Sequence, residues 1–296
     1  MLIDGVFSGG GIKGFALIGA YRAIEKNGFR FARVAGTSAG SILAAFIAAG
    51  YKSDEILEIM DNVDLKYFLD ERKSILPLMF IKWLRIYWKL GLYKGENLEN
   101  WIHEKLKAKG VKTFGDLKKG ALRVIASDLT NGRMMVIPDD LEKYGINPRY
   151  FSVARAVRMS CSLPYFFEPV RLYSKEGVNL VVDGGVLSNF PIWLFDTKNK
   201  KRPVLGVKLS PNSEERPKNK INNGIEMFGA LFETMKDAHD ARHIASKHEQ
   251  NIIFIPVEHA LSTEFNLTEE KKNKLIQIGE MRTEQFFNRW PILRLK

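Results

Sequence analysis

A serine between two glycines is the feature of this sequence with the clearest chemical potential. Ser38 stands in Gly36-Thr37-Ser38-Ala39-Gly40, after the strand-like residues 31–35 and before the alanine-rich, helix-like residues 41–49. A serine at such a strand-to-helix turn projects its Oγ outward, and the glycines prevent a clash between strand and helix. The pattern indicates a nucleophilic Ser38; the simpler alternative is a serine that caps a helix.

A glycine-rich segment follows the first strand-like stretch. In Ser8-Gly9-Gly10-Gly11-Ile12-Lys13-Gly14, three consecutive glycines precede a helix-like run. The backbone N–H groups of such a loop bind an anion, either a phosphate or the oxyanion of a tetrahedral intermediate. The spacing also fits a dinucleotide-binding loop, which requires an acidic residue about 20 positions later. Residues 34–38 contain none, and no Gly-Lys-Ser/Thr closes the segment as in a P-loop. We therefore expect an oxyanion site beside Ser38.

A nucleophilic serine needs a base, and Asp183 is the best-placed carboxylate. It follows the apolar residues Val181 and Val182 and precedes two glycines that allow close backbone approach. In a parallel sheet the strand ends gather at one edge, where Asp183 should meet Ser38. Asp128 is the competing carboxylate, but its Asp-Leu-Thr-Asn-Gly setting is typical of a turn-capping residue.

A histidine base is a second alternative. The triad of an α/β-hydrolase follows the chain order Ser, Asp, His, and His259 comes after Asp183 and after a strand-like segment. His239 and His243 lie in the charged helical stretch 236–248, which is typical of a solvated face, and His103 precedes Asp183. His259 is therefore the one histidine that we retain as a candidate.

The remaining reactive side chains indicate no other chemistry. Cys161, the single cysteine, has no neighbouring histidine, so we expect a small buried residue and not a thiol nucleophile. A single cysteine also excludes an internal disulfide, which is compatible with a reducing, cytoplasmic location. No cluster of His, Cys and carboxylate residues has metal-ligand spacing, and we expect neither a metal nor a cofactor.

The elements that must position these residues alternate between strands and helices. Strand-like and helix-like segments follow one another at 2–7, 13–27, 31–35 and 38–50. This βαβα order predicts an α/β fold, with a parallel sheet and helices on its faces. Further strands are expected at 122–127, 180–182, 204–209 and 252–257, and further helices at 95–109, 225–248 and 268–288. The polar segment 211–224 is expected to be an exposed loop.

Composition limits the partners of this chain. Its 296 residues, 45% of them hydrophobic, suffice for the core of one large domain. The net charge of +11 favours contact with a polyanion, either a nucleic acid or an anionic membrane surface. The basic residues are spread along the chain without a zinc-finger, basic-zipper or RNA-binding pattern, so the sequence argues against nucleic acid. We predict neither a signal peptide nor a membrane-spanning run.

The segment 75–92 combines aromatic, aliphatic and basic residues. Its aromatic residues are Phe80, Trp83, Tyr87 and Trp88, and its basic residues, which share one helix face, are Lys82, Arg85 and Lys89. A basic amphipathic helix with an aromatic face can lie in a membrane interface or cover a lipid-binding cleft. Alternatively, its apolar side packs on the sheet.

In their order along the chain, these motifs resemble those of the patatin-like phospholipase family. The segment Gly9–Gly14 resembles its oxyanion loop, Gly36–Gly40 its G-x-S-x-G elbow, and Asp183-Gly184-Gly185 its Asp-Gly-Gly/Ala motif. Two further stretches, Ser160–Phe167 and Asn189-Phe190-Pro191, resemble the family as well. The resemblance implies a three-layer α/β/α fold with a central, mostly parallel sheet. It also implies a single domain over residues 1–296, with a helical cap-like or membrane-contacting segment at about 66–115.

The resemblance further implies a Ser-Asp dyad without a histidine. Asp183 would deprotonate Ser38 directly and return the proton to the leaving alcohol, and water would release the acyl-enzyme. Lys13 matches the basic position of the family's loop and would support that loop or meet a phosphate head group. The oxyanion hole would be formed by Gly9, Gly10 and Gly11, with the N–H groups of Gly10 and Gly11 holding the oxyanion.

We therefore expect a serine acyl hydrolase that cleaves the fatty acyl esters of phospholipids or lysophospholipids. Such an enzyme would contact an anionic membrane surface peripherally, and the segment 75–92 would help to admit the acyl chain. Two other classes stay open. One is a Ser-Asp-His triad esterase for small soluble esters, and the other is a non-catalytic protein that binds a lipid or a nucleotide.

Overall fold

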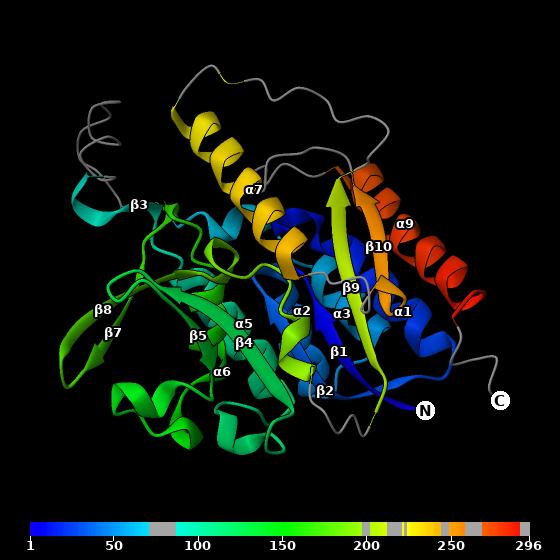
Figure 1. Ribbon diagram of the computed structural model, residues 1–296, viewed down its shortest axis with the longest axis horizontal. Helices are drawn as coiled ribbons and strands as arrows, with labels where there is room; N and C mark the ends of the chain where they lie inside the picture. The colour runs from blue at the N-terminus through cyan, green and yellow to red at the C-terminus, as the bar shows by residue number, and fades with distance from the viewer. Residues whose placement is uncertain are drawn as a thin grey trace.

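A computed structural model describes residues 1–70, 87–196, 202–211, 221, 224–243, 249–257 and 268–290. Within these residues an eight-stranded sheet forms the centre of the molecule, in the order β10-β9-β1-β2-β4-β8-β7, with β5 paired to β4 (Figure 1). The strands are β1 (Leu2–Phe7), β2 (Arg30–Thr37), β4 (Leu122–Asp128), β5 (Arg133–Ile137), β7 (Val170–Ser174), β8 (Gly177–Asp183), β9 (Val204–Pro211) and β10 (Ile252–Val257).

Five neighbouring strands of this sheet, from β10 to β4, run parallel to one another. Strands β5 and β8 join β4 in the antiparallel direction, and β7 joins β8 in the same way. Strands β1 and β4 are buried along almost their whole length, because both of their faces are covered. A second, two-stranded sheet pairs β3 (Gly91–Tyr93) with β6 (Tyr165–Phe167).

Helices cover both faces of the large sheet. They are α1 (Phe15–Lys26), α2 (Ala39–Ala48), α3 (Ser53–Asp61), α5 (Glu96–Ala108), α6 (Val153–Ser160), α7 (Gly224–His243) and α9 (Glu269–Phe287). Helix α1 packs along α9, and α2 packs on β2. In Figure 1, α1, α2 and α3 lie behind the sheet, whereas α7 lies in front of it.

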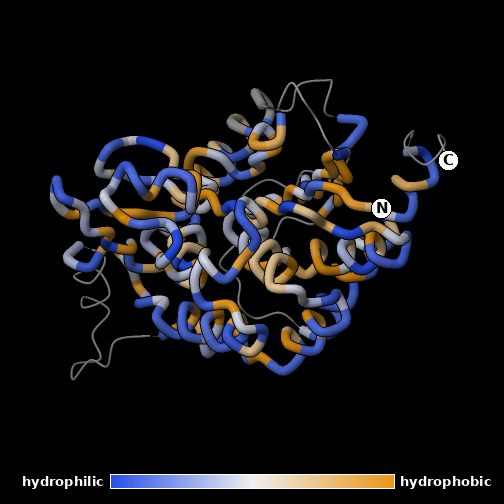
Figure 2. The backbone as a smooth tube through the Cα atoms, turned by 90° about the horizontal axis from the view of Figure 1, so that it is seen from below, coloured by the Kyte–Doolittle hydropathy of each residue, from blue (hydrophilic) through white to orange (hydrophobic). Residues whose placement is uncertain are grey.

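The core lies between the sheet and these helices. Phe7 of β1, Leu17 of α1 and Phe46 of α2 are fully buried there. In Figure 2, hydrophilic residues prevail at the periphery, and hydrophobic stretches alternate with them along the flanking helices. This is the alternation expected of helices that bury one face against a sheet.

Several of the predicted elements are confirmed, and one expectation about the sheet is wrong. The strands at 2–7 and 252–257 have the predicted bounds, and the βαβα order holds through α2. Asp183, however, does not end a parallel strand, because β8 runs antiparallel to β4. Its register still brings it to the site. Asp183 pairs with Ala126, and Ile125 beside it pairs with Thr37, the residue before Ser38.

The predicted cap and membrane segments are only partly described. The described part of 66–115 contains the end of a 3-10 turn, η2 (Leu65–Phe68), followed by β3 and α5. Of the segment 75–92, residues 75–86 lie outside the described residues, as do 212–220 and 222–223 of the predicted loop. No helix in the described part of the chain is long and apolar enough to cross a membrane.

Candidate active site

Ser38 occupies the sharp turn between β2 and α2. Its φ of 52° lies in the left-handed region that non-glycine residues seldom adopt. A Cβ on Gly36 would overlap the carbonyl oxygen of Gly40, and a Cβ on Gly40 would overlap those of Phe7 and Ser8. The two glycines therefore let β1, β2 and α2 approach one another. Ser38 stands at the N-terminus of α2, where the helix dipole favours negative charge.

The glycine-rich loop lies beside Ser38 because β1 and β2 are parallel neighbours, so the residues after both strands meet at one edge. The loop enters a 3-10 turn, η1 (Gly11–Gly14). Within the described part of the chain, the N–H groups of Gly10 and Gly11 donate to no other group. They are open donors of the kind that bind an anion.

Gly9 differs from the next two glycines. Its N–H donates to the Asn189 carbonyl oxygen at 3.0 Å, so that this amide is already used. A Cβ on Gly9 would lie 3.1 Å from the Ser38 Cβ and would overlap Asn189 Oδ1. Of the three glycines that the sequence analysis assigned to an oxyanion hole, Gly9 thus provides room beside the serine, and Gly10 and Gly11 provide the open amides.

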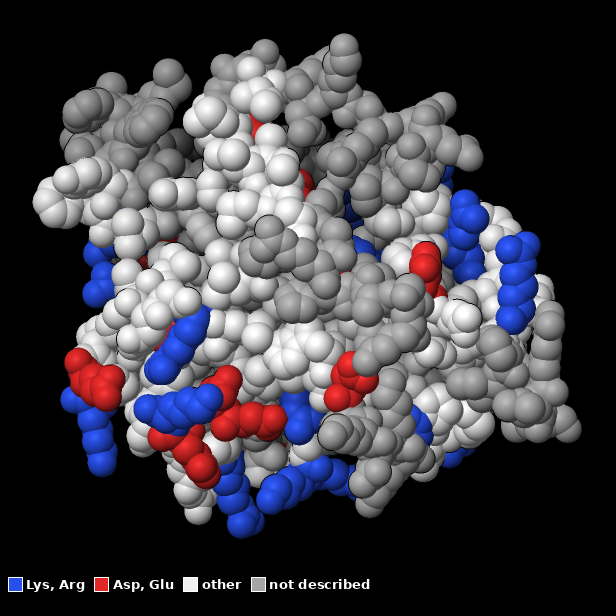
Figure 3. All heavy atoms as spheres, in the orientation of Figure 1, with Lys and Arg blue, Asp and Glu red and all other residues white. Residues whose placement is uncertain are grey.

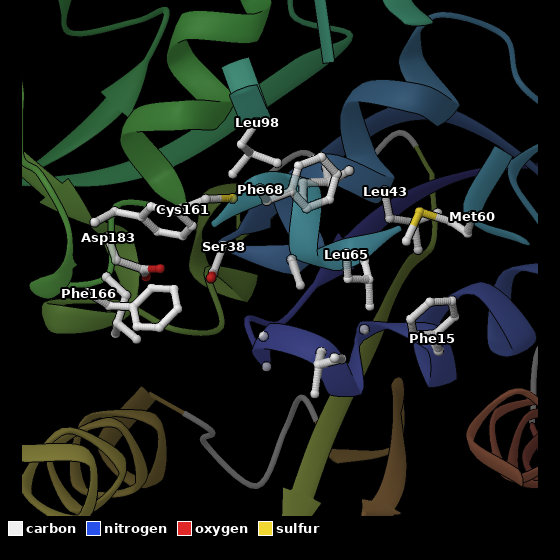
Figure 4. Close-up of a pocket in the computed structure, with 18 of the residues that line it drawn as sticks. Phe15, Ser38, Leu43, Met60, Leu65, Phe68, Leu98, Cys161, Phe166 and Asp183 are labelled. Atoms are coloured by element: carbon white, nitrogen blue, oxygen red, sulfur yellow. The ribbon is translucent and has the colours of Figure 1, made fainter. Parts of the chain in front are cut away.

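Asp183 ends β8 next to Ser38, and Figure 4 shows the two side chains with their oxygens turned toward each other. One carboxylate oxygen accepts the Gly185 N–H at 2.7 Å. Asp183 is only 3% exposed. Burial raises the pKa of Asp183 from 3.8 to about 6, and the Gly185 N–H, the Ser38 hydroxyl and the Lys236 ammonium limit that rise. The carboxyl group is therefore ionised at neutral pH and can readily take up a proton.

The end of α6 and the residues that follow it hold both residues in place. Ser160 Oγ accepts the Ser38 N–H at 2.9 Å, and the Ser162 carbonyl oxygen accepts the Asp183 N–H at 2.9 Å. Arg158, which is 2% exposed, donates to Ser162 Oγ. The serines of this stretch could not be assigned a role from the sequence, because nothing in their local sequence reveals a contact with Ser38.

Ser38 and Asp183 open onto an apolar cavity with a volume of about 140 Å³. Its wall comes from α2, α3, η2, α5 and the β6 region, and Figure 4 shows the serine and the aspartate at one end of it. Apolar side chains of the wall include Ile42, Leu43, Phe46, Met60, Phe68 and Trp101. Such a lining suits a hydrocarbon chain, with the polar groups confined to one end.

The two competing side chains are not placed for catalysis. Asp128 does not line the cavity. Its fully buried carboxylate accepts hydrogen bonds from Asn131 Nδ2 and from the Tyr144 hydroxyl, both at 2.7 Å, as expected of a turn residue. Cys161 borders the cavity, but burial raises the pKa of its thiol far above neutrality. Cys161 is therefore the small buried residue that the sequence analysis expected.

Among the side chains that the structure describes, no histidine lies at the site. His103 lies on α5 and does not line the cavity. His259 and His248 lie outside the described residues, and the side chains of His239 and His243 do too. No group of His, Cys, Asp and Glu in the described ranges could hold a metal ion.

Lys13 is buried beside the loop and not in the apolar cavity. It lines a second, polar recess of about 40 Å³, together with Lys208, Glu233 and Lys236. Within this recess Lys236 forms an ion pair with Glu233 at 3.1 Å. The recess shares Gly10 with the cavity, so Lys13 lies within reach of the loop that carries the open amides.

Comparison with known families identifies this arrangement. Residues 5–196 match the model of the family described as patatin-like phospholipase. The chain belongs to the patatin-like phospholipase family. The match contains the glycine-rich loop, the Ser38 turn and the Asp183 motif, and membership of this family supports a lipid hydrolase activity.

The relatives of this patatin-like protein include characterised and uncharacterised proteins. It is 63% identical over 290 residues to the uncharacterized protein YqhO of Bacillus subtilis (strain 168). This match covers 98% of this chain and 99% of YqhO. It is 28% identical over 195 residues to the cUMP-AMP-activated phospholipase of Escherichia coli, over 62% of this chain and 54% of that protein. The crystal structure of VipD from Legionella pneumophila matches 97% of this chain and 67% of its own, with a TM-score of 0.60 at 18% identity. The likeness to VipD supports the three-layer α/β/α fold.

Proposed function

We propose that this protein is a serine acyl hydrolase that cleaves fatty acyl esters of phospholipids or lysophospholipids through a Ser38–Asp183 dyad. The observation that carries the proposal is the Ser38 side chain turned toward a buried carboxylate, at the end of an apolar cavity and beside two open amides. A serine, a base and oxyanion donors at one point are what acyl transfer requires.

In the proposed reaction, Ser38 Oγ attacks the ester carbonyl carbon while its proton passes to the Asp183 carboxylate. The N–H groups of Gly10 and Gly11 stabilise the negative charge that develops on the carbonyl oxygen. Asp183 then returns the proton to the leaving alcohol, and the acyl group remains on Ser38. Water attacks this ester in the second half-reaction, with Asp183 again as the base, and the fatty acid leaves.

The substrate class follows from the cavity and the relatives. The wall beyond Ser38 is apolar, so it favours the acyl chain of a lipid over a small polar ester. The Escherichia coli relative is named a phospholipase, and a relative from Debaryomyces hansenii is named a lysophospholipase. Lys13 would support the oxyanion loop, and the polar recess that it lines would lie on the head-group side.

Contact with a membrane is part of this proposal, and an exposed apolar rim supports it. The β3–β6 pairing sets Gly91 opposite Tyr165, and the Tyr165 ring contacts Phe228 of α7 at 5.0 Å. Phe228 stacks on Phe232, which lines the cavity, so Tyr165 meets α7 on the face next to the cavity. In Figure 3 the described surface over α7 is nearly free of charged residues. The exposed residues of the rim are Tyr87, Trp88, Tyr165, Met227, Leu231 and Met235.

A serine-reactive probe and a lipid assay test the proposal together. A fluorophosphonate should label Ser38, and Ser38→Ala should abolish both the labelling and the release of fatty acid from lysophosphatidylcholine vesicles. Ser53→Ala is the matched control, because Ser53 also stands at the N-terminal end of a helix but lies on α3 outside the cavity wall. Undiminished fatty acid release by the Ser38 variant would refute the proposal.

The triad alternative is separated by a second pair of variants. Under the dyad, His259→Ala keeps most of the activity, and Asp183→Asn loses at least about a thousandfold, as expected when a base is removed. A triad esterase would instead lose its activity with His259→Ala. A non-catalytic lipid-binding protein would show no turnover in the wild type and unchanged binding in Ser38→Ala.

A further inference from the structure

Asn189 has a side chain whose orientation is fixed by its partners. It is 4% exposed, and its carbonyl oxygen accepts the Gly9 N–H at 3.0 Å. Its Nδ2 donates to Asp240 Oδ2 at 3.3 Å, and the same carboxylate forms an ion pair with Lys208. Because an ionised carboxylate only accepts hydrogen bonds, the nitrogen end of the amide must face Asp240. The oxygen end therefore faces the opposite way.

That oxygen has no hydrogen-bond partner among the described residues. It lies over Gly9 and Gly185, the two glycines next to the proposed dyad. A Cβ on Gly9 would overlap Asn189 Oδ1 and would lie 3.1 Å from the Ser38 Cβ. A Cβ on Gly185 would lie 3.4 Å from Asn189 Oδ1 and 3.0 Å from Asp183 Oδ1. The lone oxygen thus borders the same small space as the serine and the aspartate.

A buried acceptor without a partner destabilises a fold, so its presence at this point requires an explanation. The reacting part of an ester cannot donate a hydrogen bond to this oxygen, because its carbonyl and alkoxy oxygens are acceptors only. A water molecule can donate such a bond, since it carries two O–H groups. When water attacks an acyl-enzyme, one O–H is directed at the base, and the other needs a second acceptor in the same space.

We propose that Asn189 Oδ1 positions the water that hydrolyses the acyl-enzyme, an inference that rests on the proposed function. The water oxygen forms a bond to the acyl carbonyl carbon while one proton passes to Asp183, and the other O–H donates to Asn189 Oδ1. The tetrahedral intermediate then collapses, the bond between the carbonyl carbon and Ser38 Oγ breaks, and Ser38 Oγ recovers the proton from Asp183. Asn189 is a positioning residue for this half-reaction and takes no proton.

A competition between water and methanol tests this role. Methanol has one O–H, which it needs for Asp183, so its attack does not use Asn189. Asn189→Leu should raise the ratio of methyl ester to free fatty acid about tenfold, the effect expected from loss of one hydrogen bond. Both products arise from the same acyl-enzyme, so the ratio does not depend on how much of the variant folds. A p-nitrophenyl ester as substrate has no hydroxyl group, which removes any bond between Asn189 and a substrate alcohol.

Two further variants make the test specific to the lone oxygen. Asn189→Asp combined with Asp240→Asn exchanges the two groups, so that an acceptor stays at this position and an amide nitrogen still lies between the two side chains; this variant should leave the ratio close to that of the wild type. Ser188→Ala is the control for a lost buried hydrogen bond, because Ser188 Oγ accepts the Trp193 Nε1–H at 3.2 Å outside the cavity wall; its ratio should not change. The proposal is overturned if Asn189→Leu leaves the ratio unchanged, or if Asn189→Leu and the exchanged variant raise it equally.

Burst kinetics add a second readout. In Asn189→Leu the rapid release of p-nitrophenol should keep its rate constant while steady-state turnover falls, so that acyl-Ser38 accumulates and is seen by intact-protein mass spectrometry. A slower burst with an unchanged product ratio would place Asn189 in acylation and overturn the inference. Failure of the proposed function looks different, because the wild type itself would then form no acyl-enzyme with any ester.

Discussion

The raised pKa of Asp183 predicts opposite effects of this residue on activity and on stability. As the proposed base, the carboxyl group must be ionised before it can accept the Ser38 proton. With a pKa of about 6 in the free enzyme, kcat/KM should fall about tenfold for each pH unit below 6 and reach a plateau above about 7. This acid limb should follow the ionisation of a single group.

The same shift affects the free energy of unfolding with a definite sign. The carboxyl group titrates near 3.8 in the unfolded chain and at about 6 in the folded protein. Between these two values the folded state binds more protons than the unfolded state, so stability falls as the pH rises through this window. Above about pH 6 the full loss is present, and the shift corresponds to about 3 kcal/mol. Burying this charge therefore makes the folded protein less stable at the pH where it would be active.

Asp183→Asn separates the two effects. The amide keeps an oxygen for the Gly185 N–H but carries no charge, so this variant should be inactive and yet more stable than the wild type at neutral pH, by up to about 3 kcal/mol. Urea unfolding of both proteins at several pH values measures the difference, which should shrink toward zero between about pH 6 and pH 4. Titrations that the two proteins share cancel in this comparison.

Asp128→Asn is the matched control for the loss of a buried carboxylate. Asp128 accepts hydrogen bonds from Asn131 and Tyr144 away from the cavity, so this variant should keep its activity and lose about 1–3 kcal/mol of stability. Two results would refute the reasoning about Asp183. One is a kcat/KM that stays constant down to pH 5. The other is a difference in stability between Asp183→Asn and the wild type that does not change between neutral and acid pH.

Three further variants test the loop, the rim and the cavity. Gly9→Ala should reduce kcat by at least about a hundredfold, since its Cβ would overlap Asn189 Oδ1, whereas Gly224→Ala, which meets no atom within 4 Å, should be neutral in the same assay. Leu231→Ser should weaken sedimentation with anionic vesicles severalfold without changing the hydrolysis of a soluble ester; equal loss in both assays would contradict a role in membrane contact. Ile42→Trp should shift the preferred acyl chain to a shorter one in a chain-length series, and an unchanged preference would argue against the cavity as the acyl site.

The sequence predicted what depends on local pattern. The turn at Ser38 follows from glycines at fixed spacing and from the strand and helix that flank them, and the structure has this turn. The direction of β8 could not be predicted, because a short apolar run followed by Asp183 reads the same in either orientation. The use of the Gly9 amide by Asn189 was hidden for a similar reason, since it joins residues 180 positions apart. Contacts of this kind depend on the pairing of distant strands and leave no periodic signal in the sequence.

The structure also explains how a carboxylate could take the place of a histidine in the proposed dyad. An aspartate at its ordinary pKa of 3.8 is a weak base toward a serine hydroxyl, whereas an imidazole near 6.5 is suited to hold a proton for a short time at neutral pH. Burial at the end of β8 brings the pKa of Asp183 to about 6, close to that of an imidazole. The antiparallel register supplies the other requirement, because it sets Asp183 level with the end of β2, where Ser38 follows. The fold would thus give a two-residue site the basicity for which a triad uses histidine, at the expense of stability.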